Sequence, residues 1–140
     1  MILFLDFDGV LHPVSREAGT MVFVPNFERV MRDYPEVDIV ISSAWRESSS
    51  LVELQSHFSQ GFKERIIDAT PVLQLLDHKY LRQAEITAWL RDAGREYESW
   101  VAIDDSDWLF PPECRNLILV NGQVGLDMET ADRLRRAIKN

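Results

Sequence analysis

The stretch Met1-Ile2-Leu3-Phe4-Leu5-Asp6-Phe7-Asp8-Gly9 decides the fold of this 140-residue chain. A short continuous apolar run that stops at a turn is typical of a strand buried on both faces, as in a parallel sheet. Asp6 and Asp8 are two residues apart, so at the strand end they would lean toward the same side. Two ionised carboxylates held close together repel each other and are costly to desolvate without a cation between them. A divalent cation with oxygen ligands, such as Mg2+, meets this need. The plainer interpretation is that both acids are solvated turn residues.

Composition predicts one globular domain, residues 1–140, with a single core. The net charge of −8 argues against a broad nucleic-acid surface, although a local basic patch beside a cleft is compatible with it. The lone Cys114 excludes an intramolecular disulfide and favours a cytoplasmic setting. The apolar start is interrupted by Asp6 and lacks a basic lead-in, so no signal peptide is expected. No apolar run approaches the ~20 residues that cross a bilayer, so we expect no membrane partner.

Strands and helices are predicted to alternate along the chain, which implies βαβ crossovers and a doubly wound, mainly parallel sheet. After the opening strand, the predicted strands are Val37–Ile41, Arg65–Asp68, Trp100–Ile103 and Leu117–Val120. The predicted helices begin at Pro25 and at the Ser50/Glu53 capping box, and cover Leu81–Ala93 and Glu129–Lys139. The helix after Ser50 is expected to end near Gly61. In the first connection, Gly19 predicts a turn and a small hairpin flap over residues 10–24.

Polar residues follow three of the predicted buried strands. In open α/β sheets, ligands bind at the carboxyl ends of the strands, beside a switch in strand order. Folding needs the apolar runs but not the acids that follow them, so a shared chemical role is the better explanation. The residues concerned are Asp6 and Asp8, Ser42 and Ser43, and Asp104 and Asp105.

The run Asp6-Phe7-Asp8-Gly9-Val10-Leu11 is similar to the DxDGxL/T signature that opens the haloacid dehalogenase-like (HAD) phosphohydrolases. Candidates for the three later motifs of that family follow in order. Asp38-Ile39-Val40-Ile41-Ser42-Ser43 resembles the second, Lys79 or Arg82 would be the cation of the third, and Trp100-Val101-Ala102-Ile103-Asp104-Asp105 resembles the fourth.

Two further stretches resemble a narrower branch, the small HAD domains grouped with multi-domain RNA-repair proteins. They are Trp45-Arg46-Glu47-Ser48 and Arg82-Gln83-Ala84-Glu85-Ile86.

The resemblance implies a three-layer, Rossmann-like HAD core and a phosphatase that works through an aspartyl-phosphate. Asp6 would be the nucleophile and Asp8 the general acid/base, a role that calls for a raised pKa in its acid step. Mg2+ would be held by Asp6, Asp104 and the backbone carbonyl of Asp8, with Asp105 bound directly or through water.

The phosphate would be held by a hydroxyl and by a cation. Ser42 is preferred to Ser43 for the first, and Arg82 to Lys79 for the second, because a cation at a helix start opposes the helix dipole and calls for another reason to be there. Three residue types near the motifs have plain structural interpretations as well. Asp107 would assist the metal through water or belong to an ordinary loop, Trp45 and Trp108 would stack on a base or pack in the core, and His12 is given no catalytic role.

Neither long connection leaves room for an inserted cap domain, so the resemblance implies a minimal cap or none, and an open site. An open site suits a phosphorylated small molecule or a nucleic-acid end. The alternative function is a phosphate-end or nucleotide binding module, or a phospho-acceptor with little turnover, in an RNA-repair or signalling complex.

Overall fold

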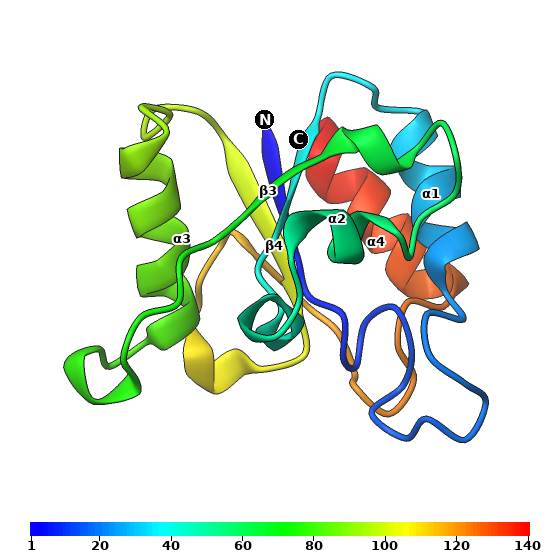
Figure 1. Ribbon diagram of the computed structural model, residues 1–140, viewed down its shortest axis with the longest axis horizontal. Helices are drawn as coiled ribbons and strands as arrows, with labels where there is room; N and C mark the ends of the chain where they lie inside the picture. Colours follow the sequence, from blue (N-terminus) through cyan, green and yellow to red (C-terminus); the bar gives the residue numbers. More distant parts are fainter.

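A computed structural model describes all residues, 1–140, and its centre is a five-stranded sheet in which every pairing is parallel (Figure 1). The strand order is β3-β2-β1-β4-β5, so the chain winds outward in both directions from the opening strand. This confirms the predicted doubly wound α/β fold. The strands are β1 Ile2–Leu5, β2 Asp38–Ile41, β3 Ile66–Ala69, β4 Trp100–Asp104 and β5 Leu117–Leu119.

The central position of β1 explains its unbroken apolar sequence. Its four residues are fully buried, and its side chains alternate between two separate clusters. Leu3 and Leu5 contribute to the larger cluster, whereas Ile2 and Phe4 contribute to the smaller one. A strand with helices on both faces has no polar side, as the sequence pattern predicted.

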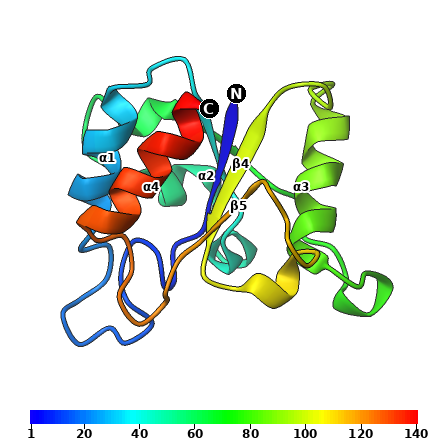
Figure 2. The same ribbon diagram turned by 180° about the vertical axis from the view of Figure 1, so that it is seen from behind.

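Helices cover the sheet in two layers, which completes the three-layer architecture (Figures 1 and 2). One face carries α1 (Val24–Arg32), α2 (Leu51–Gln55) and α4 (Met128–Lys139). The other face carries α3 (Leu81–Asp92), which packs Ile86, Trp89 and Leu90 against the sheet.

The predicted hairpin flap over residues 10–24 is wrong, because the chain forms turns there and its last residue begins α1. The segment pairs at long range instead. Val14 N–H donates to Gly122 O at 2.7 Å, and Val10 O accepts from Leu126 N–H at 2.8 Å. The loop between β5 and α4 therefore satisfies the backbone groups that a local hairpin would have paired.

The helix after Ser50 is shorter than predicted. The capping box between Ser50 and Glu53 is present, but α2 ends at Gln55 and the chain continues in turns. Gly61 adopts the left-handed φ of 86° within these turns, not at the end of the helix.

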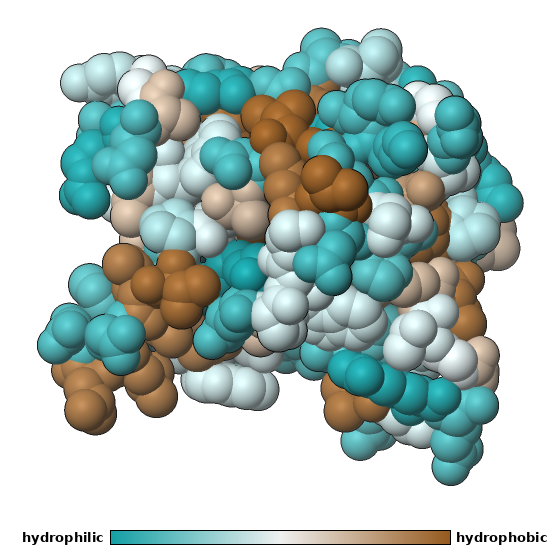
Figure 3. Space-filling view, in the orientation of Figure 1, coloured by the Kyte–Doolittle hydropathy of each residue, from teal (hydrophilic) through white to brown (hydrophobic).

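No separate folded unit is inserted in either long connection, in agreement with a minimal cap or none. Each of the helices is too short or too polar to cross a bilayer. Exposed apolar side chains gather at the lower left of Figure 3, over the segment that leads into α3. Val72, Leu75 and Leu76 are 48%, 62% and 99% exposed in that segment.

Candidate active site

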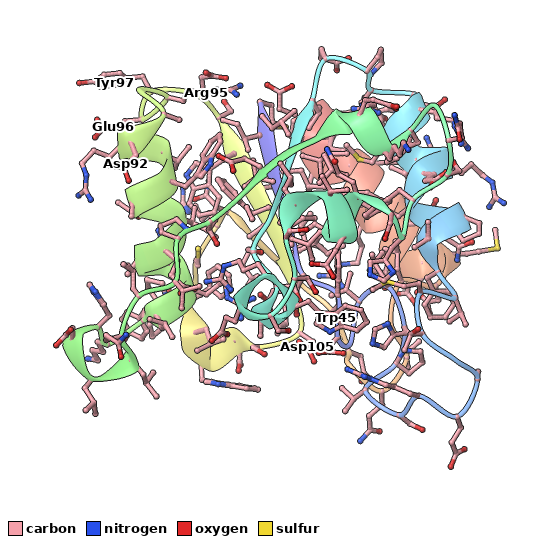
Figure 4. The ribbon with its side chains drawn as sticks, viewed as in Figure 1. Trp45, Asp92, Arg95, Glu96, Tyr97 and Asp105 are labelled. Atoms are coloured by element: carbon pink, nitrogen blue, oxygen red, sulfur yellow. The ribbon has the colours of Figure 1, made fainter.

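The register of the sheet brings three strand ends together. Leu5 lies beside Ile41 of β2 and Ile103 of β4, so the residues that follow them are neighbours. Asp6 and Asp104 are buried here, with 5% and 1% of their surface exposed. In Figure 4, Trp45 and Asp105 mark this end of the sheet, whereas Arg95, Glu96 and Tyr97 lie at the opposite end.

The acids Asp6, Asp104 and Asp105 form one cluster, in which a carboxylate oxygen of each lies within 4.8 Å of the others. Burial raises the pKa of Asp6 well above its usual range, and the charges of Asp104 and Asp105 raise it further. Burial also raises the pKa of Asp104, against the opposing effect of Arg82. The cluster therefore carries more negative charge than the protein compensates.

The residues in this cluster fit a magnesium site. All three offer carboxylate oxygens, which are the ligands that Mg2+ prefers, and a divalent cation would offset their negative charge. The side chain of Asp8 is outside the cluster, so a contribution of that residue to a metal would come from its backbone.

The Asp105 side chain packs directly against two glycines, Gly9 and Gly122, which leave room for it. A Cβ atom at Gly9 would lie 2.2 Å from Asp105 Oδ2, and one at Gly122 would lie 2.5 Å from the same atom. Gly9 also has a φ of 77°, which side chains disfavour. The Asp-Gly pair of the opening motif is thus required by the close approach of a carboxylate as well as by the turn.

Arg82 is the cation that faces the acids. Its Nη1 donates to Asp104 Oδ2 at 2.9 Å and lies 3.6 Å from Asp6 Oδ1. Lys79 is exposed, and its ammonium lies 5.4 Å from the centre of the Tyr80 ring. Lys79 makes no ion pair with these acids. Of the two predicted cations, the structure brings Arg82 and not Lys79 into the cluster.

Glu85 lies between Arg82 and a second arginine, Arg46. Glu85 lies 3.7 Å from Arg82 Nε, and on its other side it lies 2.6 Å from Arg46 Nη2. Arg46 also donates to four backbone carbonyls at the ends of β2 and β3, namely those of Ser42, Ser43, Thr70 and Pro71. In the sequence, Arg46 and Glu85 were noted only as parts of two stretches that resemble the RNA-repair branch. Their role in supporting Arg82 was not predicted. Their place inside the two branch-specific stretches was the available signal.

The two serines after β2 have different partners. Ser43 Oγ accepts from the Trp45 N–H at 3.3 Å and caps the short 3-10 helix Ala44–Glu47. Ser42 Oγ is buried and has no hydrogen-bond partner in the protein. The same is true of Thr70 Oγ1, beside it at the end of β3, and of Arg82 Nε. Thr70 is a further polar residue of the site that sequence reasoning did not assign.

Asp8 has surroundings opposite to those of Asp6. Its Oδ1 accepts from His12 at 2.8 Å and from Arg16 at 2.7 Å, and its Oδ2 accepts from the Trp45 indole N–H at 3.0 Å. Burial alone would raise the pKa of Asp8, but these hydrogen bonds outweigh it and lower the pKa. This is the reverse of the raised pKa that a general acid calls for.

The histidine in this network has a defined tautomer. The Met21 N–H donates to His12 Nδ1 at 3.2 Å, so the ring proton must be on Nε2, which donates to Asp8. His12 is fully buried, and Trp45 packs against it at a ring-centre distance of 5.8 Å. Both residues thus hold Asp8 in place. Asp107 is exposed and does not join the acid cluster.

A model of the protein family described as "HAD domain in Swiss Army Knife RNA repair proteins" matches residues 2–131 of the chain. No curated protein and no solved structure matches the chain.

We expect Mg2+ to raise the melting temperature, and Asp104→Asn to abolish this gain. A ligand at 100 times its Kd adds about 2.7 kcal/mol to the free energy of unfolding. Because the folded-state pKa values of Asp6 and Asp104 are raised, their contribution to stability without metal is lost as the pH rises through those values. The gain from Mg2+ should therefore be larger at a pH above those raised pKa values than at a pH below them.

The measurement is thermal unfolding with and without Mg2+, with Asp107→Asn as the matched control because Asp107 is exposed and outside the cluster. A melting curve that does not move at saturating Mg2+ would contradict the metal site.

Proposed function

This chain belongs to the family of HAD domains of Swiss Army Knife RNA repair proteins, and on that premise we propose that it is a Mg2+-dependent phosphohydrolase. The proposed reaction passes through an aspartyl-phosphate, and the proposed substrates are phosphorylated nucleotide or polynucleotide ends in the cytoplasm. The observation that carries the proposal is the meeting of buried acids, a buried guanidinium and unpaired hydroxyls at one sheet edge.

The proposed metal ligands are Asp6, Asp104 and the backbone carbonyl of Asp8, with Asp105 bound directly or through water. Bound there, Mg2+ neutralises part of the charge on the phosphate oxygens, which otherwise repels a nucleophile. The raised pKa values of Asp6 and Asp104 support this set, because burial makes their charged forms costly and a bound cation would stabilise them.

The proposed phosphate ligands are Arg82 and Ser42. The Ser42 hydroxyl is buried without a partner, so it has a hydrogen to donate to a phosphate oxygen. Thr70 offers a second hydroxyl of the same kind at the adjacent strand end. Arg82 supplies the positive charge beside Asp6 and Asp104, while its Nε faces Glu85. Preorganised donors in a buried site are worth more than the same groups in water. Ser43 is committed to its cap, which favours Ser42.

In the proposed first step, an Asp6 carboxylate oxygen attacks phosphorus as the bond between phosphorus and the ester oxygen breaks. The departing oxygen takes its proton from Asp8. In the second step, water attacks the phosphorus of the aspartyl-phosphate and gives its proton to Asp8, which releases inorganic phosphate and restores Asp6.

The hydrogen bonds to Asp8 favour its part in the second step. An ionised Asp8 is ready to accept a proton from water, whereas donation to a leaving group requires protonation first. Arg16 is the half-exposed member of the three donors, since 52% of its side-chain surface is accessible. Its release from Asp8 would remove one cause of the lowered pKa.

The same observation supports the alternative function, a phosphate-end binding or phospho-acceptor module that turns over slowly. The two functions differ in the fate of phosphate. An enzyme releases inorganic phosphate over many turnovers with Mg2+, whereas an acceptor stops near one phosphate per chain. We expect repeated turnover in a screen that compares small phosphate esters with 3′- and 5′-phosphorylated oligonucleotides. Release that stops after one equivalent would favour the alternative.

We expect Arg82→Ala to weaken phosphate binding about tenfold or more, because a charged hydrogen bond contributes about 1.5–3 kcal/mol. Lys79→Ala, which removes an exposed cation that lies over the Tyr80 ring, is the matched control and should have little effect. The measurement is competitive inhibition by inorganic phosphate in the presence of Mg2+. If Lys79→Ala is the more damaging of the two, the assignment of the cation is reversed.

Asp6→Asn and Asp8→Asn should separate the two acids. Asp6→Asn removes the attacking charge, so no aspartyl-phosphate should form. Asp8→Asn leaves the nucleophile intact, so an activated ester with a good leaving group should still phosphorylate Asp6. The adduct should then accumulate, because hydrolysis still needs a base. Mass spectrometry after incubation with the activated ester is the measurement.

The outcome that would overturn this division of labour is an adduct on the Asp6→Asn protein at any aspartate of the site. Activity unaffected by both substitutions would return the two acids to a solvated strand end.

A further inference from the structure

A hollow of about 610 Å3 lies between the start of α3, the loop that follows β4 and strand β5. Its volume is within the range of sites that take small molecules or single nucleotides. Its lining includes two aromatic residues that are not buried, two prolines and two acids: Tyr80, Trp108, Pro111, Pro112, Asp107 and Glu113. A larger hollow over α1 is less suited to a ligand, because its acids Glu28 and Asp33 are already paired with Arg32 and Arg135.

Trp108 is presented at this hollow by the short 3-10 helix Asp107–Leu109, which follows the acid loop. Two residues later, Phe110 is buried to 1% exposure against α3 and anchors the segment. Trp108 itself stays 68% exposed. A single exposed apolar residue is ordinary on a protein surface, but this indole lines a cavity and stands on an anchored turn.

The hollow lies within the length of a nucleotide or two from the proposed phosphate site. Trp108 is four residues from Asp104, which spans at most ~14 Å of chain. On the other side, Tyr80 is two residues from Arg82, at most ~7 Å. The elements that carry Arg82 and Asp104 thus continue within a few residues into the lining of the hollow.

The lining chemistry selects among occupants. Flat aromatic and proline faces suit a planar ring, whose stacking is tolerant of sequence. The carboxylates of Asp107 and Glu113 would be desolvated without compensation by an aliphatic side chain, whereas they accept hydrogen bonds from the amino groups of a base. The same carboxylates repel a second phosphate, and the chain carries a net charge of −8. These features together favour one base at a chain end over a long tract of nucleic acid.

We propose that the hollow between Tyr80 and Trp108 is a nucleobase subsite, which holds the base of the nucleotide whose phosphate is bound at Arg82. The proposal rests on the proposed function, and it restricts the substrate to a nucleotide or a polynucleotide end. Trp108 stacks on the base, and Asp107 or Glu113 accepts from its exocyclic amino group. Adenine, cytosine and guanine are therefore bound in preference to uracil.

The test compares nucleoside monophosphates with ribose phosphate, which lacks the base. In Trp108→Ala, the ratio of kcat/KM for the nucleotide to kcat/KM for ribose phosphate should fall about tenfold, the loss expected for one stacked base. Trp108→Phe keeps a ring and should retain most of the ratio. Tyr97→Ala is the control, since Tyr97 is fully exposed at the opposite end of the sheet (Figure 4).

A second readout does not depend on turnover. Titration of the full chain with a nucleoside monophosphate should quench tryptophan fluorescence, and Trp108→Phe should remove that change while calorimetry still detects binding. An unchanged ratio in Trp108→Ala together with an absent quench would overturn the subsite, even if phosphatase activity is present. Quenching without phosphatase activity would support the subsite and count against the proposed function alone.

Discussion

The structure depends on a buried carboxylate pair, Asp6 and Asp104, that faces a single guanidinium. Two charges removed from water are costly unless their partners are close and well oriented. Here Asp104, Arg82, Glu85 and Arg46 alternate in sign, with contacts of 2.9, 3.7 and 2.6 Å. The chain of charges ends where Arg46 donates to the carbonyls after β2 and β3. The first helix turn of α3 and three strand ends are thereby joined through the polar groups of the site.

The sequence predicts the architecture because apolar runs and their spacing carry it. Each buried strand is a run that folding requires, and the order of the runs implies the parallel sheet. The first connection could not be predicted in the same way, because its backbone partners lie far along the chain. Val10 and Val14 pair with residues 122–126, at a sequence separation that no local turn signal reports. Gly19 indicated a hairpin turn where long-range backbone pairing is found instead.

The candidate site also contains residues that the sequence predicts and contacts that it does not. Asp6, Asp104, Asp105 and Arg82 each follow a strand or begin a helix, so their convergence is a consequence of the sheet register. The surroundings of Asp8 come from separate segments, and its donors include one residue that sequence reasoning left without a role, His12. The tautomer of that histidine is set by a backbone N–H at Met21, a residue with a left-handed φ of 60°. No residue pattern contains this information.

Asp6 and Asp8 are two residues apart, yet their environments push their pKa values in opposite directions. Burial among carboxylates raises one, and three hydrogen-bond donors lower the other. Titratable groups separated in this way can take different parts in one reaction. In the metal-free protein, the raised pKa of Asp6 opposes ionisation, and attack on phosphorus needs the carboxylate. A cation at the cluster would remove that obstacle by favouring the charged form of Asp6. Asp8 needs no such help to accept a proton, because its donors already favour the charged form. In the proposed reaction, a bound cation would therefore favour the attacking form of Asp6, whereas the donors around Asp8 favour its proton-accepting form without a metal.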